Sequence, residues 1–138
     1  MQNALTDNYR NIGLSTGTGM VDADPYKLIQ MLYQGLLDKL AKSKGYIARN
    51  DIEGRNNTIN RCIEIIDCLR TSLDHDASST LTANLENLYN YMEERLFIAN
   101  ANNDHSGIDE VAKLVITVKS GWDNIPEQER NPARSAVH

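Results

Sequence analysis

The sequence predicts an all-α protein, an antiparallel up-and-down four-helix bundle with a flexible N-terminal arm that has room for a short capping helix. Three observations favour this fold class. Apolar residues recur with the 3.6-residue period of an amphipathic helix in four separate stretches. Short polar segments separate these stretches, and connections of this length place successive helices side by side and antiparallel. The 138 residues suit one domain with a single core.

The N-terminal arm is expected to cover residues 1–23. Residues 11–19 are rich in Gly, Ser and Thr, a composition typical of flexible segments. The first twenty residues have neither a basic start nor a continuous apolar run, so we expect no secretory signal.

The first helix is expected at residues 24–47 and the second at residues 51–73. Asp24 can cap the first helix, and Pro25 suits its first position because the missing N–H would have no partner there. A polar break at residues 49–51 separates the two helices. The second helix carries an apolar stripe made of Ile52, Ile59, Cys62, Ile63, Ile66, Leu69 and Leu73.

The third helix is expected at residues 79–101. A short polar segment precedes it, and either Ser78 or Ser79 can serve as its N-cap. Its apolar face consists of Leu81, Leu85, Leu88, Tyr89, Met92, Leu96 and Ala99.

The fourth helix is expected at residues 107–122, because Ser106 and Asp109 have the spacing of a capping box. Residues 114–118 are rich in β-branched side chains, but a lone strand would have no pairing partner, and the helical period continues through them. The bundle therefore covers residues 24–122. Residues 123–138 are expected to form a polar C-terminal tail.

Charge and hydropathy exclude two classes of function. The formal net charge is -5, and Lys and Arg are spread along the chain, so no basic stripe is available for nucleic acid. No run approaches the roughly 18 apolar residues that a membrane-spanning helix needs. We therefore expect a soluble cytosolic protein without membrane insertion.

The sequence contains no pattern for catalysis, a metal or a cofactor. A di-metal bundle site needs Glu and His three residues apart on two helices, and no Glu in the chain has such a His. There is no glycine-rich phosphate loop and no nucleophile elbow. Cys62 and Cys68 lie about 9 Å apart along one expected helix and cannot bridge each other there. We expect a protein that is not an enzyme.

Apolar residues exceed what a one-sided helix needs. Leu28 and Met31, together with Gly35, widen the apolar arc of the first helix well beyond 100°. On the third helix, Tyr91 and Ile98 point away from the main stripe. One explanation is that bundles need broad stripes and that single exposed apolar residues are ordinary. The other is a groove for a partner helix. The residues alone thus favour a helical bundle that binds a helix or peptide.

Three motifs carry a resemblance to a known family. Residues 25–35, PYKLIQMLYQG, are similar to the opening signature of the FliS-type flagellar secretion chaperones. Residues 63–69, IEIIDCL, and residues 84–92, NLENLYNYM, resemble the second- and third-helix patterns of the same family. Several motifs agree in series along residues 9–122, so together they are specific.

This resemblance implies a cytosolic export chaperone that binds the disordered C-terminal region of flagellin. Binding would prevent premature polymerisation, and the complex would be delivered to the flagellar type III export gate. The alternative is a generic helical-bundle adaptor that binds a different amphipathic helix. The residues expected to contact the client are Leu28, Met31, Tyr33, Tyr89, Tyr91 and Ile98, with Tyr9 on a displaceable arm. For each of them, packing inside the bundle is the competing interpretation.

Overall fold

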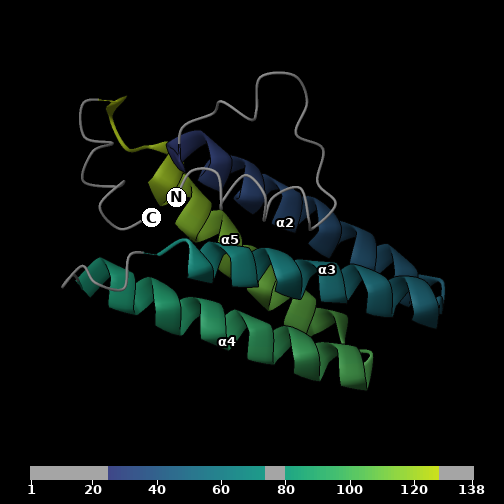
Figure 1. The fold of residues 1–138 in the computed structure, drawn as a ribbon. Coiled ribbons are helices and arrows are strands. Elements are labelled where there is room, and N and C mark those ends of the chain that lie inside the picture. The colour runs from purple at the N-terminus through teal and green to yellow at the C-terminus, as the bar shows by residue number, and fades with distance from the viewer. Residues whose placement is uncertain (1–24, 74–79, 128–138) are drawn as a thin grey trace.

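Four α-helices make up the part of the chain that the computed structural model describes, residues 25–73 and 80–127 (Figure 1). The prediction of an all-α fold is confirmed. The arm over residues 1–23, the capping Ser78 or Ser79 and most of the tail lie outside the described residues. The helices are α2 (Pro25–Ala48), α3 (Ile52–Thr71), α4 (Thr80–Asn102) and α5 (His105–Asp123).

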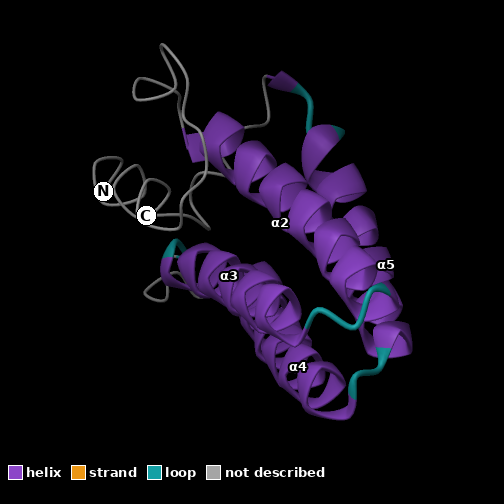
Figure 2. Ribbon diagram, turned by 90° about the vertical axis from the view of Figure 1, so that its right-hand side faces the viewer, coloured by secondary structure: helices purple, strands orange, loops and turns teal. Residues whose placement is uncertain are grey.

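The helices form a closed bundle in which each helix packs against two others. α2 contacts α3 and α5, and α4 contacts the same two helices from the opposite corner. Figure 2 shows α2 beside α5 and α3 beside α4, with the α2–α3 and α4–α5 turns together at one end. This is the antiparallel up-and-down arrangement that the short connections predict. α2 and α4 therefore lie diagonally across the core.

Aspartate side chains cap the two helices that follow the short turns. Asp51 accepts a hydrogen bond from the backbone N–H of Gly54 at 2.9 Å and starts α3 at the expected break. Asp104 accepts from the backbone N–H of Ser106 at 3.0 Å, so α5 begins at His105. The expected capping box at Ser106 was wrong, because the aspartate two residues earlier supplies the cap.

Asparagines close both of these turns. Asn50 and Asn103 are the two non-glycine residues with positive φ in the described part of the chain, at 56° and 53°. Asparagine tolerates this left-handed conformation better than most residues. The two turns therefore bring α2 to α3 and α4 to α5 with few residues and fixed geometry.

The core runs through the whole bundle and departs from the predicted stripes at several positions; Ile65 and Cys68, for example, are buried although neither was expected in the stripe of its helix. Leu28, expected beside the core face of its helix, is fully buried. Ile52 and Leu81, expected inside, are 61% and 50% exposed, because each stands in the first turn of its helix, where fewer neighbouring side chains cover it. The expected stripes otherwise hold, with Ile59, Cys62, Ile66, Leu69, Met92, Leu96, Ile108, Val111 and Val115 all buried.

A reciprocal contact joins the beginning of α2 to the end of α5. Tyr26 donates its hydroxyl hydrogen to the carbonyl oxygen of Trp122 at 2.8 Å, and the Trp122 indole N–H donates to the carbonyl oxygen of Tyr26 at 3.1 Å. The two rings stack with centroids 5.5 Å apart. This contact pairs the first and last helices of the described bundle.

Both cysteines are free and buried; Cys62 was expected in the core, whereas Cys68 was not part of the predicted stripe. Burial raises the pKa of the Cys62 and Cys68 thiols to about 12, so neither is a reactive thiolate. Within the described residues, no helix has the length and apolar character that crossing a bilayer requires.

Candidate client-binding site

Three of the residues expected to contact a client lie in the core instead of on the surface. The side chains of Leu28, Tyr33 and Tyr89 are each at most 2% exposed. The hydroxyl groups of Tyr33 and Tyr89 share a hydrogen bond of 2.6 Å, which joins the diagonal helices α2 and α4 through the centre of the bundle. Burial raises the pKa of Tyr33 well above its ordinary value and that of Tyr89 to about 12, so both phenols stay neutral. In this structure the three side chains pack inside the bundle, which was the competing interpretation for each of them.

Met31 stands at the margin of the core. It is half-buried on α2 and packs against the core cluster from its edge. An unbranched thioether side chain in such a position can contact either the core or a partner.

Tyr91 and Ile98 form the exposed part of the predicted set. They are 44% and 42% exposed and stand seven residues apart on α4, so they occupy the same side of that helix. We call this pair the α4 outer face. It adjoins α5, because Tyr91 donates its hydroxyl hydrogen to the Glu110 carboxylate, which also accepts from Arg95 Nε at 2.9 Å.

The electrostatics of this contact favour an ionised carboxylate. The hydrogen bonds from Tyr91 and Arg95 lower the pKa of Glu110, and the carboxylate in turn raises the pKa of the Tyr91 hydroxyl. The Tyr91 ring is thus held at the α4–α5 edge by a polar anchor while much of its apolar surface faces solvent.

The structure does not bring the predicted residues into one groove. Met31 lies on α2 and the α4 outer face on the helix diagonally opposite, with α3 and α5 packed against both helices. A partner that touched both would have to wrap around the bundle. Tyr9 lies outside the described residues, so its role stays a prediction.

Among the described residues, four exposed large apolar side chains are absent from the predicted set. Ile52 and Leu81 were assigned to the core because their spacing continues the buried stripes, and the sequence signal against this was their place in the first turn. Ile116 lies on α5, seven residues after Asp109, which pairs with Lys44 of α2 at 2.6 Å, so it faces the α2 side of that helix. The fourth is Phe97, which is 70% exposed.

Comparison with known proteins identifies the family. A model of the family described as flagellar protein FliS matches residues 5–129. The flagellar secretion chaperone FliSB of Pseudomonas aeruginosa is 46% identical over 104 residues, which cover 75% of this chain and 82% of the relative. The flagellar secretion chaperone FliS of Escherichia coli is 34% identical over 118 residues, or 85% of each chain. That of Salmonella typhimurium is 31% identical over 113 residues, 81% of this chain and 84% of the relative.

The match spans the described bundle and extends past it on both sides. It agrees with the motifs in α2, α3 and α4 and with the helical fold. The chain therefore belongs to the FliS family of flagellar secretion chaperones, a family of helical-bundle proteins that are not enzymes.

Proposed function

We propose that this chain acts in the cytosol as an export chaperone for flagellin. It binds the disordered C-terminal region of flagellin, prevents premature polymerisation, and delivers the client to the flagellar type III export gate. Membership of the FliS family supports the chaperone role. The observation that carries the proposal for this chain is the set of apolar side chains that the bundle leaves exposed.

A disordered client needs an extended apolar surface. Ordering such a segment costs conformational entropy, so binding must bury enough apolar area to compensate for that cost. The described surface offers it on more than one helix: α4 exposes Leu81, Tyr91, Phe97 and Ile98, and α3 exposes Ile52. A flexible segment can follow such a divided surface, whereas a rigid globular partner would contact only one side of it.

The α4 outer face is the part of this surface that we assign to the client first. Tyr91 and Ile98 present a seven-residue repeat, which an amphipathic client helix can match with its own apolar side chains. Met31 extends the contact on α2. Leu28, Tyr33 and Tyr89 support the surface from within and would touch the client directly only if the helices separated on binding. Tyr9 remains the proposed contact of the arm.

Two charge substitutions on the α4 outer face test the proposal. We expect Tyr91→Asp and Ile98→Asp each to weaken flagellin binding at least tenfold, because each places a charge in an apolar contact that must lose its water. The matched control is Ile116→Asp, an exposed apolar position on the α2 side of α5, away from the α4 outer face. It should leave binding within twofold of wild type. Binding is measured by calorimetric titration with the flagellin C-terminal segment.

Circular dichroism of each variant separates lost binding from lost folding. If both α4 variants keep the helical spectrum and still bind at wild-type strength, the α4 outer face is not the client site. Binding of an unrelated amphipathic helix in preference to flagellin would instead favour the generic adaptor.

A further inference from the structure

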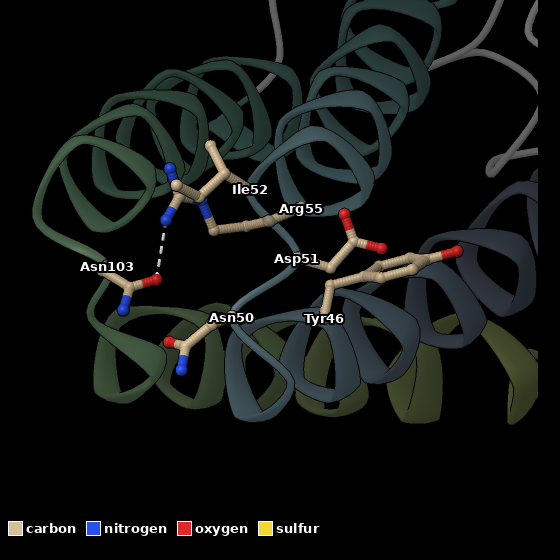
Figure 3. A pocket seen from close by; sticks show the side chains of 6 residues that line it. All are labelled: Tyr46, Asn50, Asp51, Ile52, Arg55 and Asn103. Carbon is tan, nitrogen blue, oxygen red and sulfur yellow. Dashed lines mark hydrogen bonds between the residues drawn. The ribbon is translucent and has the colours of Figure 1, made fainter.

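A small pocket lies at the end of the bundle where the α2–α3 and α4–α5 turns meet. Its volume is about 370 Å³, near the lower end of the range of ligand pockets. Figure 3 shows side chains from both turns around it. We call it the turn pocket, and its lining residues are Tyr46, Asn50, Asp51, Ile52, Arg55 and Asn103.

Arg55 is the cation of the turn pocket, and neutral groups hold it. Its Nε donates to Asn100 Oδ1 at 2.8 Å, its Nη1 to Asn103 Oδ1 at 2.7 Å and its Nη2 to Asn56 Oδ1 at 3.3 Å. Three amide oxygens thus fix the guanidinium group without neutralising its charge.

Three of the four other arginines in the described residues pair with carboxylates, and Arg49 lies over the Tyr46 ring instead. Arg61 pairs with Glu64, Arg70 with Asp67 and Glu93, and Arg95 with Asp104 and Glu110. Among the described ion pairs, Arg55 has none. An oriented, half-buried cation without a counter-charge favours an anionic ligand.

Arg55 keeps hydrogen-bond donors that can serve a carboxylate. A guanidinium group has five N–H donors, and the amide contacts use one on each nitrogen. One N–H remains on Nη1 and one on Nη2. Two such donors on neighbouring nitrogens can form the fork that binds a carboxylate through two hydrogen bonds.

The rest of the pocket suits the apolar part of a residue. Ile52 is 61% exposed at its rim, and the Tyr46 ring forms the opposite wall. That ring packs closely on the start of α3, where a Cβ at Gly54 would lie 2.5 Å from two of its carbons. Arg49 lies over the same ring, 5.0 Å from its centroid, and adds a second positive charge nearby.

Asp51 is the one acidic residue of the lining, and its carboxylate is already engaged. It caps α3 through the backbone N–H of Gly54. In Figure 3 its oxygens lie beside the Tyr46 ring, while the Arg55 guanidinium lies on the other side of the pocket near Asn103. It therefore does not fill the free fork of Arg55.

We propose that the turn pocket binds the terminal carboxylate of the client, with Arg55 Nη1 and Nη2 as donors and the last side chain against Tyr46 and Ile52. This inference rests on the proposed function, because a C-terminal client segment always ends in a carboxylate. The α4 outer face leads to the same end of the bundle. Asn103, which lines the pocket, follows Ile98 by about 8 Å of helix.

The test compares two forms of the flagellin C-terminal segment, one with a free terminal carboxylate and one with a terminal amide. Calorimetric titration of the full chain should show the amide binding about tenfold more weakly, since it loses a charge-assisted hydrogen-bonded pair. With Arg55→Gln both forms should bind alike, at the strength of the amide. The matched control is Arg61→Gln, which removes an exposed arginine of the same helix and should preserve the difference.

Each other outcome has a distinct meaning. Equal binding of the two forms to the wild-type chain overturns the inference and leaves the proposed function standing. A difference that persists in Arg55→Gln places the carboxylate elsewhere and also overturns it. If neither form binds, the proposed function fails, and this inference fails with it.

A third peptide, with a free C-terminus and its acidic side chains converted to amides, should bind like the first; weaker binding would assign the pocket to a side-chain carboxylate. The comparison of the two peptides on the wild-type chain needs no variant, so it tests the inference even if Arg55→Gln unfolds.

Discussion

The hydroxyl groups of Tyr33 and Tyr89 are each other's partners in an otherwise apolar part of the core. The atoms are 2.6 Å apart, and both residues are fully buried. The edge of the Tyr33 ring faces Trp122, with centroids 6.4 Å apart. A buried hydroxyl without a partner costs more than the hydrogen bond itself contributes, so the two hydroxyls should be strongly coupled.

We expect Tyr89→Phe to lower the free energy of unfolding by about 1–3 kcal/mol, because it leaves the Tyr33 hydroxyl buried and unpaired. The double variant Tyr33→Phe, Tyr89→Phe should recover much of this loss, since it removes both polar groups. Urea denaturation of the wild type, both single variants and the double variant measures the coupling. A double variant as unstable as the sum of the single changes would show that the pair is not coupled.

Glu93 is a partly buried carboxyl group whose ionisation opposes folding. It faces α3, where Arg70 Nη1 lies 2.9 Å from Glu93 Oε2 and the same guanidinium group also pairs with Asp67. Its second oxygen, Oε1, is buried without a hydrogen-bond partner among the described residues. Burial, together with the Asp67 carboxyl, raises the pKa of Glu93 to about 7 against the pull of Arg70.

Because the folded state prefers protonated Glu93, its contribution to stability is greatest below about pH 4.5 and falls as pH rises towards 7. Glu93→Gln does not titrate, so its stability relative to wild type should grow from pH 5 to pH 8 by on the order of 1 kcal/mol. Denaturation at the two pH values measures this difference. Glu94→Gln, an exposed neighbour, controls for the lost charge, and a Gln variant at position 93 with a pH profile parallel to wild type would refute the assignment.

At the scale of elements, two glycines of α5 have opposite roles. A Cβ at Gly107 would lie 2.6 Å from Arg95 Nη1 and 2.8 Å from the Ala99 Cβ, so Gly107 lets α5 approach α4 closely. A Cβ at Gly121 would meet nothing within 4 Å. The first glycine is required by packing, and the second only weakens the helix.

Gly107→Ala should therefore destabilise the bundle by about 1–3 kcal/mol through overpacking. Gly121→Ala should stabilise it by up to about 1 kcal/mol, because alanine is the better helix former. Thermal unfolding should give a lower melting temperature for Gly107→Ala and a higher one for Gly121→Ala. Equal effects of the two changes would contradict the close approach of α4 and α5 at Gly107.

The elements also show what the sequence can and cannot predict. Each helix lies within two residues of its expected bounds, because Asp51, Pro25 and the apolar period mark its ends locally. Which side of each helix is buried is harder to predict from the sequence. Leu28 was expected beside the core and is buried, since a helix with two neighbours buries a broader arc than a one-sided stripe.

The candidate site was predictable only in part for the same reason. Exposure of Tyr91 and Ile98 follows from their position opposite the main stripe of α4. Burial of Tyr33 and Tyr89 depends on a contact between helices 56 residues apart in the chain, which no local period reveals. The turn pocket likewise joins residues from two turns that only the closed bundle brings together.

At the scale of the whole molecule, the bundle combines a closed core with a divided apolar surface. The contact of Tyr26 with Trp122 pairs the first described helix with the last. The hydrogen bond between Tyr33 and Tyr89 joins the diagonally opposite helices α2 and α4. The scaffold can thus hold its helices in place while exposed apolar residues on α3 and α4 remain available. Such a molecule suits a client that folds along it more than one that docks as a rigid body.

The most direct test of this account is calorimetric titration of the full chain with the C-terminal segment of flagellin from the same organism, followed by circular dichroism of the mixture. We expect saturable binding near one to one, a negative heat-capacity change from buried apolar surface, and more helical signal than the sum of the separate components. A soluble, intact segment that shows no binding would contradict the flagellin chaperone function.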